Sequence, residues 1–256
     1  MLTLQQLITQ LATGSIEVVD LTAPLSERTP VISLPADLGQ AWPFRRELIS
    51  QYDDAGPETY WNNIRLSEHT GTHFDAPVHW LSGRDGNDIS QVPPQKLIGP
   101  AAVLDFSLDA SADPDFLLER RHVDDWQDRH GPLPEGGWLL FRTGWDTRGD
   151  DPARFLNDGH TPGIEASCAR WLAEKTPIIG VGVETVGTDA GLAPSFSQPF
   201  PCHWYLQGAG KYGLTQLRNL GRLPALGAVV VAAPLPIVRG SGSPARVLAL
   251  VETQGR

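Results

Sequence analysis

The chain has 256 residues, a formal net charge of −10 and an ordinary globular composition, with 41% hydrophobic and 20% charged residues. Its negative charge argues against nucleic-acid binding, which depends on clustered Lys and Arg, and no apolar run reaches the roughly 18 residues of a membrane span. Residues 1–7 also lack the basic region of a secretory signal, so we expect a cytoplasmic protein that binds neither nucleic acid nor membrane.

Apolar periodicity predicts short helices and strands along the whole chain. A helix is expected over residues 4–11, ended by Gly14, and residues 22–60 are expected to form loops because they are rich in Pro, Asp and Ser. Further helices are expected to begin at Asp113, as an N-cap before Pro114, and at Val123, and to cover residues 162–174. The expected strands cover residues 16–21, 61–66, 101–106, 138–143, 178–183, 228–233 and 245–251.

These elements alternate without strict βαβ repetition, which predicts an α/β or α+β fold with a mixed sheet. The 26 glycines and 22 prolines indicate many tight turns and long loops. No linker composition divides the chain, so residues 1–256 are expected to form one domain. Cys168 and Cys202 form no CxxC pair and are expected to be reduced thiols; a disulfide between them and a weak ligand role for Cys202 are the other readings.

A cluster of histidines around one aspartate is the main chemical signal. Its residues are His69, His73, Asp75 and His79. On a strand, positions 73 and 75 face the same side about 6.6 Å apart, from where both side chains can reach one ion. A straight strand would separate residues 69 and 79 by roughly 33 Å, so the backbone must bend, with Gly71 and Pro77 suited to the bends.

This spacing makes His73 and Asp75 the safest metal ligands and His69 the next. His79 is either a ligand or an acid/base group. Imidazole with carboxylate suits zinc, manganese or iron(II), and three protein ligands leave positions open for water, as in catalytic sites. A bound cation lowers the pKa of that water toward about 7. The competing interpretation is a polar turn whose histidines only satisfy backbone groups.

The motif His-x-Gly-Thr-His-x-Asp-x-Pro-x-His resembles the signature of the cyclase-like metal-dependent amidohydrolases, which include bacterial kynurenine formamidases and isatin hydrolases. The similarity extends over nearly the whole chain and is greater to isatin hydrolases, through residues 68–80, 112–118, 187–191 and 240–246. The resemblance implies an α/β fold with a barrel-like core and flanking helices, in a homodimer or higher homo-oligomer.

The resemblance also implies roles for individual residues. His69, His73 and Asp75 correspond to the metal ligands, His79 to the general acid/base and His203 to a distant active-site histidine. The formamidases hold a second zinc ion through a glutamate twelve residues after that histidine. Here the position is Thr215, followed by Gln216, which favours a single ion, manganese or alternatively zinc.

Other residues are candidates for contacts with the substrate. Trp61 and Trp80 flank the cluster and could stack on a flat aromatic molecule, with core packing as the alternative. Asn62 could donate to a carbonyl, and Gln216 could hydrogen-bond water or the leaving group. Glu184 and Asp189 follow an expected strand and are either site residues or salt-bridge partners.

The expected function is therefore a metal-dependent hydrolase that opens a cyclic amide of a small molecule with activated water, and isatin to isatinate is the best-matched reaction. His79 would move the proton to the departing nitrogen. Kynurenine formamidase and a lactone hydrolase of the dienelactone type need the same machinery and are the alternatives. A protein that only binds metal or a small ligand is the alternative from another class.

Overall fold

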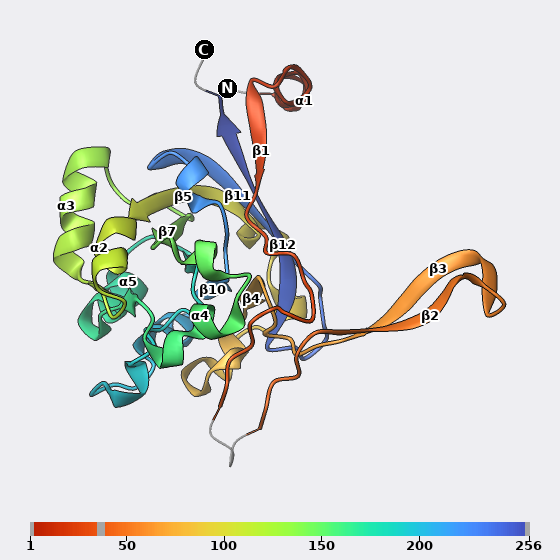
Figure 1. Ribbon diagram of the computed structural model, residues 1–256. Helices are drawn as coiled ribbons and strands as arrows, with labels where there is room; N and C mark the ends of the chain where they lie inside the picture. The colour runs from red at the N-terminus through yellow and green to blue at the C-terminus, as the bar shows by residue number, and fades with distance from the viewer. Residues whose placement is uncertain (1–2, 35–38, 254–256) are drawn as a thin grey trace.

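Seven strands close into a mixed barrel in the computed structural model, which describes residues 3–34 and 39–253 (Figure 1). Around the barrel lie β12 (Gly242–Glu252), β11 (Leu226–Pro234), β5 (Ile98–Asp105), β7 (Trp138–Arg142), β9 (Gly180–Val183), β10 (Tyr212–Thr215) and β4 (His73–Asp75). Strand β4 pairs with both β10 and β12 and so closes the ring. Strands β5, β7, β9 and β10 run parallel, while β1 (Ile16–Asp20) joins β12 from outside the ring. This architecture confirms the predicted fold class.

The parallel strands are buried on both faces, which explains their continuous apolar sequences. In β7, Trp138 and Leu140 belong to the core cluster that also contains Phe74 of β4. Leu139 and Phe141, on the opposite face, belong to a second cluster. That cluster lies beneath α3 (Arg120–His130) and α5 (Ala166–Lys175) and includes residues of β6 (Leu117–Leu118) and β8 (Gly163–Ile164). Two short helices, α2 (Ser107–Ala112) and α4 (Pro152–Leu156), complete the helical side.

A long hairpin leaves the body of the molecule (Figure 1). It consists of β2 (Arg45–Asp53) and β3 (Gly56–Arg65), which pair only with each other. The prediction of loops was therefore wrong for residues 45–60. Most side chains of the hairpin are exposed on both faces, so its sequence lacks the apolar alternation of a half-buried strand. We call this hairpin, residues 45–65, the arm.

The other expected strands are present with shifted ends. The helix expected from Val123 begins earlier, at Arg120, and the start of the helix expected over residues 162–174 forms β8 before α5 begins at Ala166. The first helix, α1 (Leu4–Thr13), ends at Gly14 in the left-handed conformation as predicted. The helix expected from Asp113 was wrong: α2 ends just before this residue, and the Asp113 carboxylate accepts from the amide of Asp115 in a turn. None of the helices in the described residues combines the length and hydrophobicity of a membrane-spanning segment.

Candidate metal centre

The bends that the sequence requires are present on both sides of β4. Gly71 has a φ of +66°, where the absence of a side chain avoids strain. On the other side, a 3-10 helix at Pro77–His79 turns the chain back. Between them, β4 holds His73 opposite Thr215 and Asp75 opposite Gly213. His69 and His79 are thereby folded onto the side of β4 from which His73 and Asp75 project.

The side chains converge on the buried carboxylate of Asp75. Its Oδ1 lies 2.9 Å from His69 Nδ1 and 3.3 Å from His73 Nε2. His69, Asp75 and His79 each offer a ligand atom within 4.8 Å of the others. Atoms bound about 2.1 Å from one ion stand roughly 3.0 to 3.4 Å apart, for angles between octahedral and tetrahedral. The two separations from Asp75 Oδ1 suit neighbouring ligands of a single ion, whereas the wider group within 4.8 Å contains His79 and not His73.

The hydrogen bonds of His73 leave its Nε2 atom available to bind a metal ion. His73 Nδ1 lies 2.7 Å from the carbonyl oxygen of Gly71, which can only accept, so Nδ1 carries the proton and Nε2 keeps its lone pair. The Thr215 hydroxyl lies at the edge of this ring, 2.8 Å from Nδ1 and 3.1 Å from Nε2. Thr215 is the residue twelve positions after His203, so a hydroxyl stands there instead of a second carboxylate.

The electrostatics of Asp75 call for a cation. Burial raises the pKa of this carboxyl, but the neighbouring imidazoles, with His73 foremost, outweigh burial and hold the pKa well below its usual range. The side chain is 1% exposed, and its Oδ2 has no hydrogen-bond partner. A buried charged oxygen without a partner is costly unless a counter-ion is supplied. The donor set and the unpartnered oxygen thus both fit a divalent metal.

Aromatic rings lie on one side of the proposed metal ligands. The ring of Trp80 lies 4.7 Å from that of His203 and 5.3 Å from that of Phe200, measured between centroids. His203 begins a short π-helix, His203–Gln207, and its ring is 5.4 Å from that of His79. Flat rings in this arrangement can stack on an aromatic substrate.

The comparisons with known proteins give the family. A family model described as a putative cyclase matches residues 19–190. The chain belongs to this cyclase family. It is 44% identical over 249 residues to the isatin hydrolase of Roseibium aggregatum, covering 94% of each chain. It is 30% identical to the kynurenine formamidase of Polaromonas naphthalenivorans, over 93% of this chain and 92% of that one. The solved isatin hydrolase A of Ralstonia solanacearum matches with a TM-score of 0.95 and 48% identity, over 97% of both chains.

In this cyclase-family member, some predicted substrate residues lie near the cluster and others do not. Trp80 and His203 adjoin His79. Trp61 and Asn62 lie on β3 of the arm, where Trp61 is 56% exposed, and the arm points away from the body (Figure 1). Within one chain the structure does not bring these two residues to the metal ligands.

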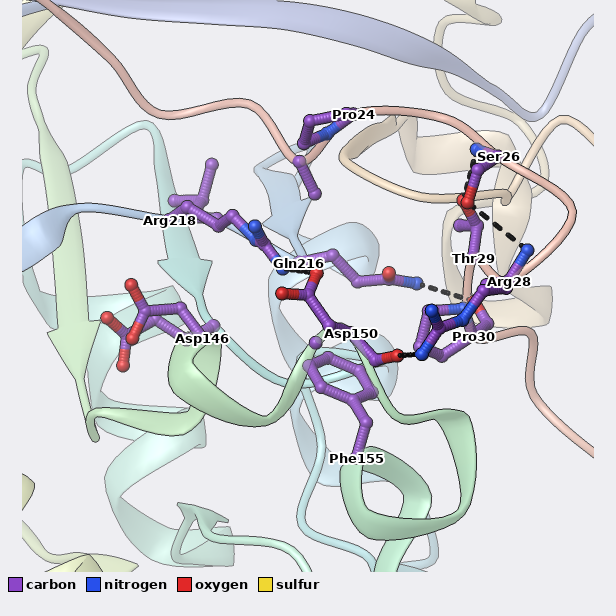
Figure 2. A pocket seen from close by; sticks show the side chains of 14 residues that line it. Pro24, Ser26, Arg28, Thr29, Pro30, Asp146, Asp150, Phe155, Gln216 and Arg218 are labelled. Atoms are coloured by element: carbon purple, nitrogen blue, oxygen red, sulfur yellow. Dashed lines mark hydrogen bonds and ion pairs between the residues drawn. The ribbon is translucent and has the colours of Figure 1, made fainter.

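Gln216 lies behind the cluster. Its φ of +51° follows β10, and its amide donates to the carbonyl oxygen of Pro30 at 3.2 Å. Figure 2 shows this side chain in a cavity of about 230 Å³ that also contains Arg28, Asp150 and Arg218. The predicted ligands and His79 are absent from the lining of that cavity. Toward the metal cluster, Gln216 therefore contacts only the segment that carries the ligands, through its backbone carbonyl oxygen, which accepts from the hydroxyl of Thr72 at 2.6 Å.

Asp189 has a role that the sequence left undecided. Its carboxylate accepts from the amide of Cys202 at 2.7 Å and from the amide of His203 at 3.2 Å, and it pairs with Nδ1 of the His203 ring. This pairing outweighs burial and raises the pKa of His203. Asp189 thus fixes both the start of the π-helix and the orientation of the imidazole. The only signal in the sequence was its position after a buried strand.

Proposed function

We propose that this chain is a metal-dependent hydrolase that opens the five-membered ring of isatin to give isatinate. The observation that carries the proposal is the convergence of His69, His73 and Asp75, with His79 beside them and aromatic rings on one side. The 44% identity to an isatin hydrolase over 94% of the chain supports the choice of substrate. We further propose that residues 1–256 act as one catalytic domain.

The proposed metal site uses Nδ1 of His69, Nε2 of His73 and the carboxylate of Asp75. Mixed imidazole and carboxylate ligation suits manganese or zinc, and we propose a single ion, with manganese first. Thr215, at the position where the resemblance to the formamidases implies a glutamate for a second ion, supports the single ion. When bound, such an ion supplies Lewis-acid polarisation of a carbonyl and makes water acidic enough to deprotonate near neutral pH.

His79 is the proposed acid/base residue. Isatin hydrolysis adds water to the amide carbonyl carbon and breaks the bond from that carbon to nitrogen. A proton must leave the water, and the departing nitrogen must gain one. His79 is close enough to the proposed ligands to serve both needs, because its ring stacks on that of His69 at 3.9 Å. Proton transfer at both stages is the task of a general acid–base.

His203 and Trp80 are proposed to position the aromatic substrate. Asp189 pairs with Nδ1 of His203 and raises the pKa of this imidazole, and the protonated ring can donate from Nε2 to a substrate oxygen. Trp80 packs against His203 at a tilt of 35° and edge-on against Phe200, and it presents apolar surface that a planar bicyclic molecule can cover. Gln216 keeps a supporting role in this proposal, through the backbone contact with Thr72.

The arm supports the proposal of a homodimer. An isolated two-stranded hairpin is only marginally stable in water, yet this one carries exposed Leu48, Tyr52, Tyr60, Trp61 and Ile64. A second copy that covers these side chains would stabilise the arm. In such a dimer, Trp61 and Asn62 would lie near the substrate site of the partner subunit.

We propose a cytoplasmic location for the enzyme. Cys168 and Cys202 are both buried and free, as expected where thiols are kept reduced. This state also fits the expectation that both cysteines are reduced thiols.

The test is a substrate panel with metal-depleted protein. The protein is treated with chelator, reloaded with manganese or zinc, and mixed with isatin, N-formylkynurenine or a dienelactone. We expect ring opening of isatin that depends on the metal, with weaker or no turnover of the other two. Absence of isatin opening at every metal loading would contradict the proposal. Faster turnover of N-formylkynurenine or lactone would favour that alternative, and tight metal binding without any turnover would favour a binding protein.

A further inference from the structure

A three-residue turn, Gly240–Gly242, lies directly on the residues that begin the metal cluster. All the polar atoms of its central residue, Ser241, are engaged. The amide and hydroxyl both donate to Glu68 Oε2, at 3.0 Å and 2.7 Å. The carbonyl oxygen accepts from the amide of Ala76 at 3.0 Å. The hydroxyl oxygen also lies 2.8 Å from Nε2 of His69.

The direction of these hydrogen bonds follows from their chemistry. A carboxylate has only acceptor atoms, so the single hydroxyl proton of Ser241 is directed to Glu68. The Ser241 oxygen can then only accept from His69, which requires the proton of that imidazole to be on Nε2. Nδ1 of His69 is left with its lone pair, and this is the atom 2.9 Å from Asp75 Oδ1.

The two glycines beside Ser241 allow this close approach. A Cβ atom at residue 242 would lie 2.6 Å from His69 Cε1 and 2.6 Å from the carbonyl oxygen of Phe74. A Cβ atom at residue 240 would lie 3.0 Å from Glu68 Oε1. The Cβ atom at residue 240 would also lie 2.9 Å from Ile237 and from Ile89. Because contacts below 3 Å force atoms to move, the turn keeps this position only when both flanking residues lack side chains.

We propose that Glu68 and Ser241 are positioning residues that hold His69 in one tautomer and one orientation, with Nδ1 directed at the metal. This inference rests on the proposed metal site and extends it to a chain of contacts, Glu68 to Ser241 to His69. Groups that hold a ligand histidine in this way typically change metal affinity or activity by about 10- to 100-fold when they are removed. This series of hydrogen bonds joins residues 172 positions apart, so it forms only when β4 pairs with β12 and closes the barrel.

Metal affinity provides a test that does not depend on turnover. Chelator-treated wild type and variants are titrated with zinc or manganese in competition with a chromophoric chelator. We expect Ser241→Ala to weaken binding by about 10- to 100-fold. The matched control is Ser243→Ala, which removes a fully buried hydroxyl two residues along; within residues 3–34 and 39–253 this hydroxyl bonds only to Leu235 and Pro244. This control should bind metal as the wild type does.

Glu68→Gln keeps the shape of the side chain, but it replaces a carboxylate, which only accepts hydrogen bonds, by an amide that also donates. The amide of the variant can donate to Ser241, which frees the serine proton to point at His69 Nε2 and favours the wrong tautomer. We expect weaker metal binding than wild type, with a smaller loss than in Ser241→Ala. If Ser241→Ala does not fold, this variant decides the question. Binding by both folded variants as tight as in Ser243→Ala would overturn the inference.

The tautomer can also be observed directly. In zinc-loaded protein with nitrogen-15 labelled histidine, the His69 ring should carry its proton on Nε2, and this signal should change in Ser241→Ala. A proton on Nδ1 of wild-type His69 would overturn the inference. Failure of this inference can be distinguished from failure of the proposed function. A wild type that binds zinc with this His69 tautomer but does not open isatin refutes the reaction alone. A wild type that opens isatin while Ser241→Ala keeps full metal affinity refutes the positioning alone.

Discussion

The imidazole of His79 stacks on that of His69, with the ring centroids 3.9 Å apart and the planes 27° from parallel. Burial lowers the pKa of His79 to about 3, and the neighbouring imidazoles act in the same direction against the charge of Asp75. The ring is therefore neutral near neutral pH. We expect His79→Ala to lower kcat for isatin by about 10²- to 10⁴-fold, the usual contribution of a general acid–base.

Steady-state kinetics on the metal-loaded variant provide the measurement, with metal content determined in parallel. His130→Ala is the matched control, because it removes an exposed imidazole of α3 that packs only against Trp126. An His79 variant that keeps full turnover would show that the proton is carried by another group. Loss of metal together with turnover would instead place His79 among the ligands.

Asp189→Asn tests whether the orientation of His203 matters for the reaction. Asparagine keeps the size of the side chain, but it replaces one acceptor oxygen by a donor, so the contacts to the Cys202 and His203 amides and to the ring cannot all be retained. We expect kcat/KM for isatin to fall roughly 10- to 100-fold, within the range of acid–base and positioning effects, and the pH profile to shift. An unchanged pH profile with a lower melting temperature would indicate a purely structural role.

Glu184 provides a prediction about stability and pH. Its Oε2 accepts from the amides of Thr143 and Trp145, at 2.7 Å and 3.2 Å. Burial, followed by the charge of Asp146, raises the pKa of Glu184 from 4.5 to about 7. The folded protein thus holds a proton that the unfolded chain releases. The stabilisation that this bound proton gives the folded state is complete below pH 4.5 and is lost as the pH rises through about 7.

Glu184→Gln stays neutral at every pH and should remove this dependence. The measurement is the free energy of unfolding of variant and wild type by denaturant, at about pH 5 and about pH 8. We expect the variant to gain stability relative to wild type between the lower and the higher pH. If the free energies of unfolding of variant and wild type differ by the same amount at both pH values, the carboxyl does not titrate in this range.

Local sequence patterns were sufficient to predict strands β5, β7, β9, β11 and β12 of the barrel, but neither the short β10 nor most of the arm. Residues 138–143 and 178–183 are continuous apolar runs because both faces of β7 and β9 are buried. The arm, with both faces exposed, has no such pattern. The metal ligands could be predicted because residues 69–79 carry their chemistry and bends within one short segment.

The supporting residues could not be predicted because their partners are distant in the chain. Ser241 reaches His69 only when β12 pairs with β4, and nothing near residue 241 indicates a metal site. Gln216 illustrates another limit. Its position in the sequence favoured a substrate contact, whereas the backbone turn at φ +51° directs its side chain to the carbonyl of Pro30. Such orientations depend on tertiary structure.

The exposed Trp61 of the arm gives the last prediction. If a second copy covers this 56% exposed side chain, Trp61→Ala should weaken the dimer and raise KM for isatin, because the ring would lie near the site of the partner. Sedimentation velocity over a range of concentrations measures the first effect, and steady-state kinetics measure the second. The matched control is Leu108→Ala, which removes an 85% exposed apolar side chain from α2 on the body. A Trp61 variant that sediments and turns over as wild type does would exclude the arm from both the interface and the substrate site.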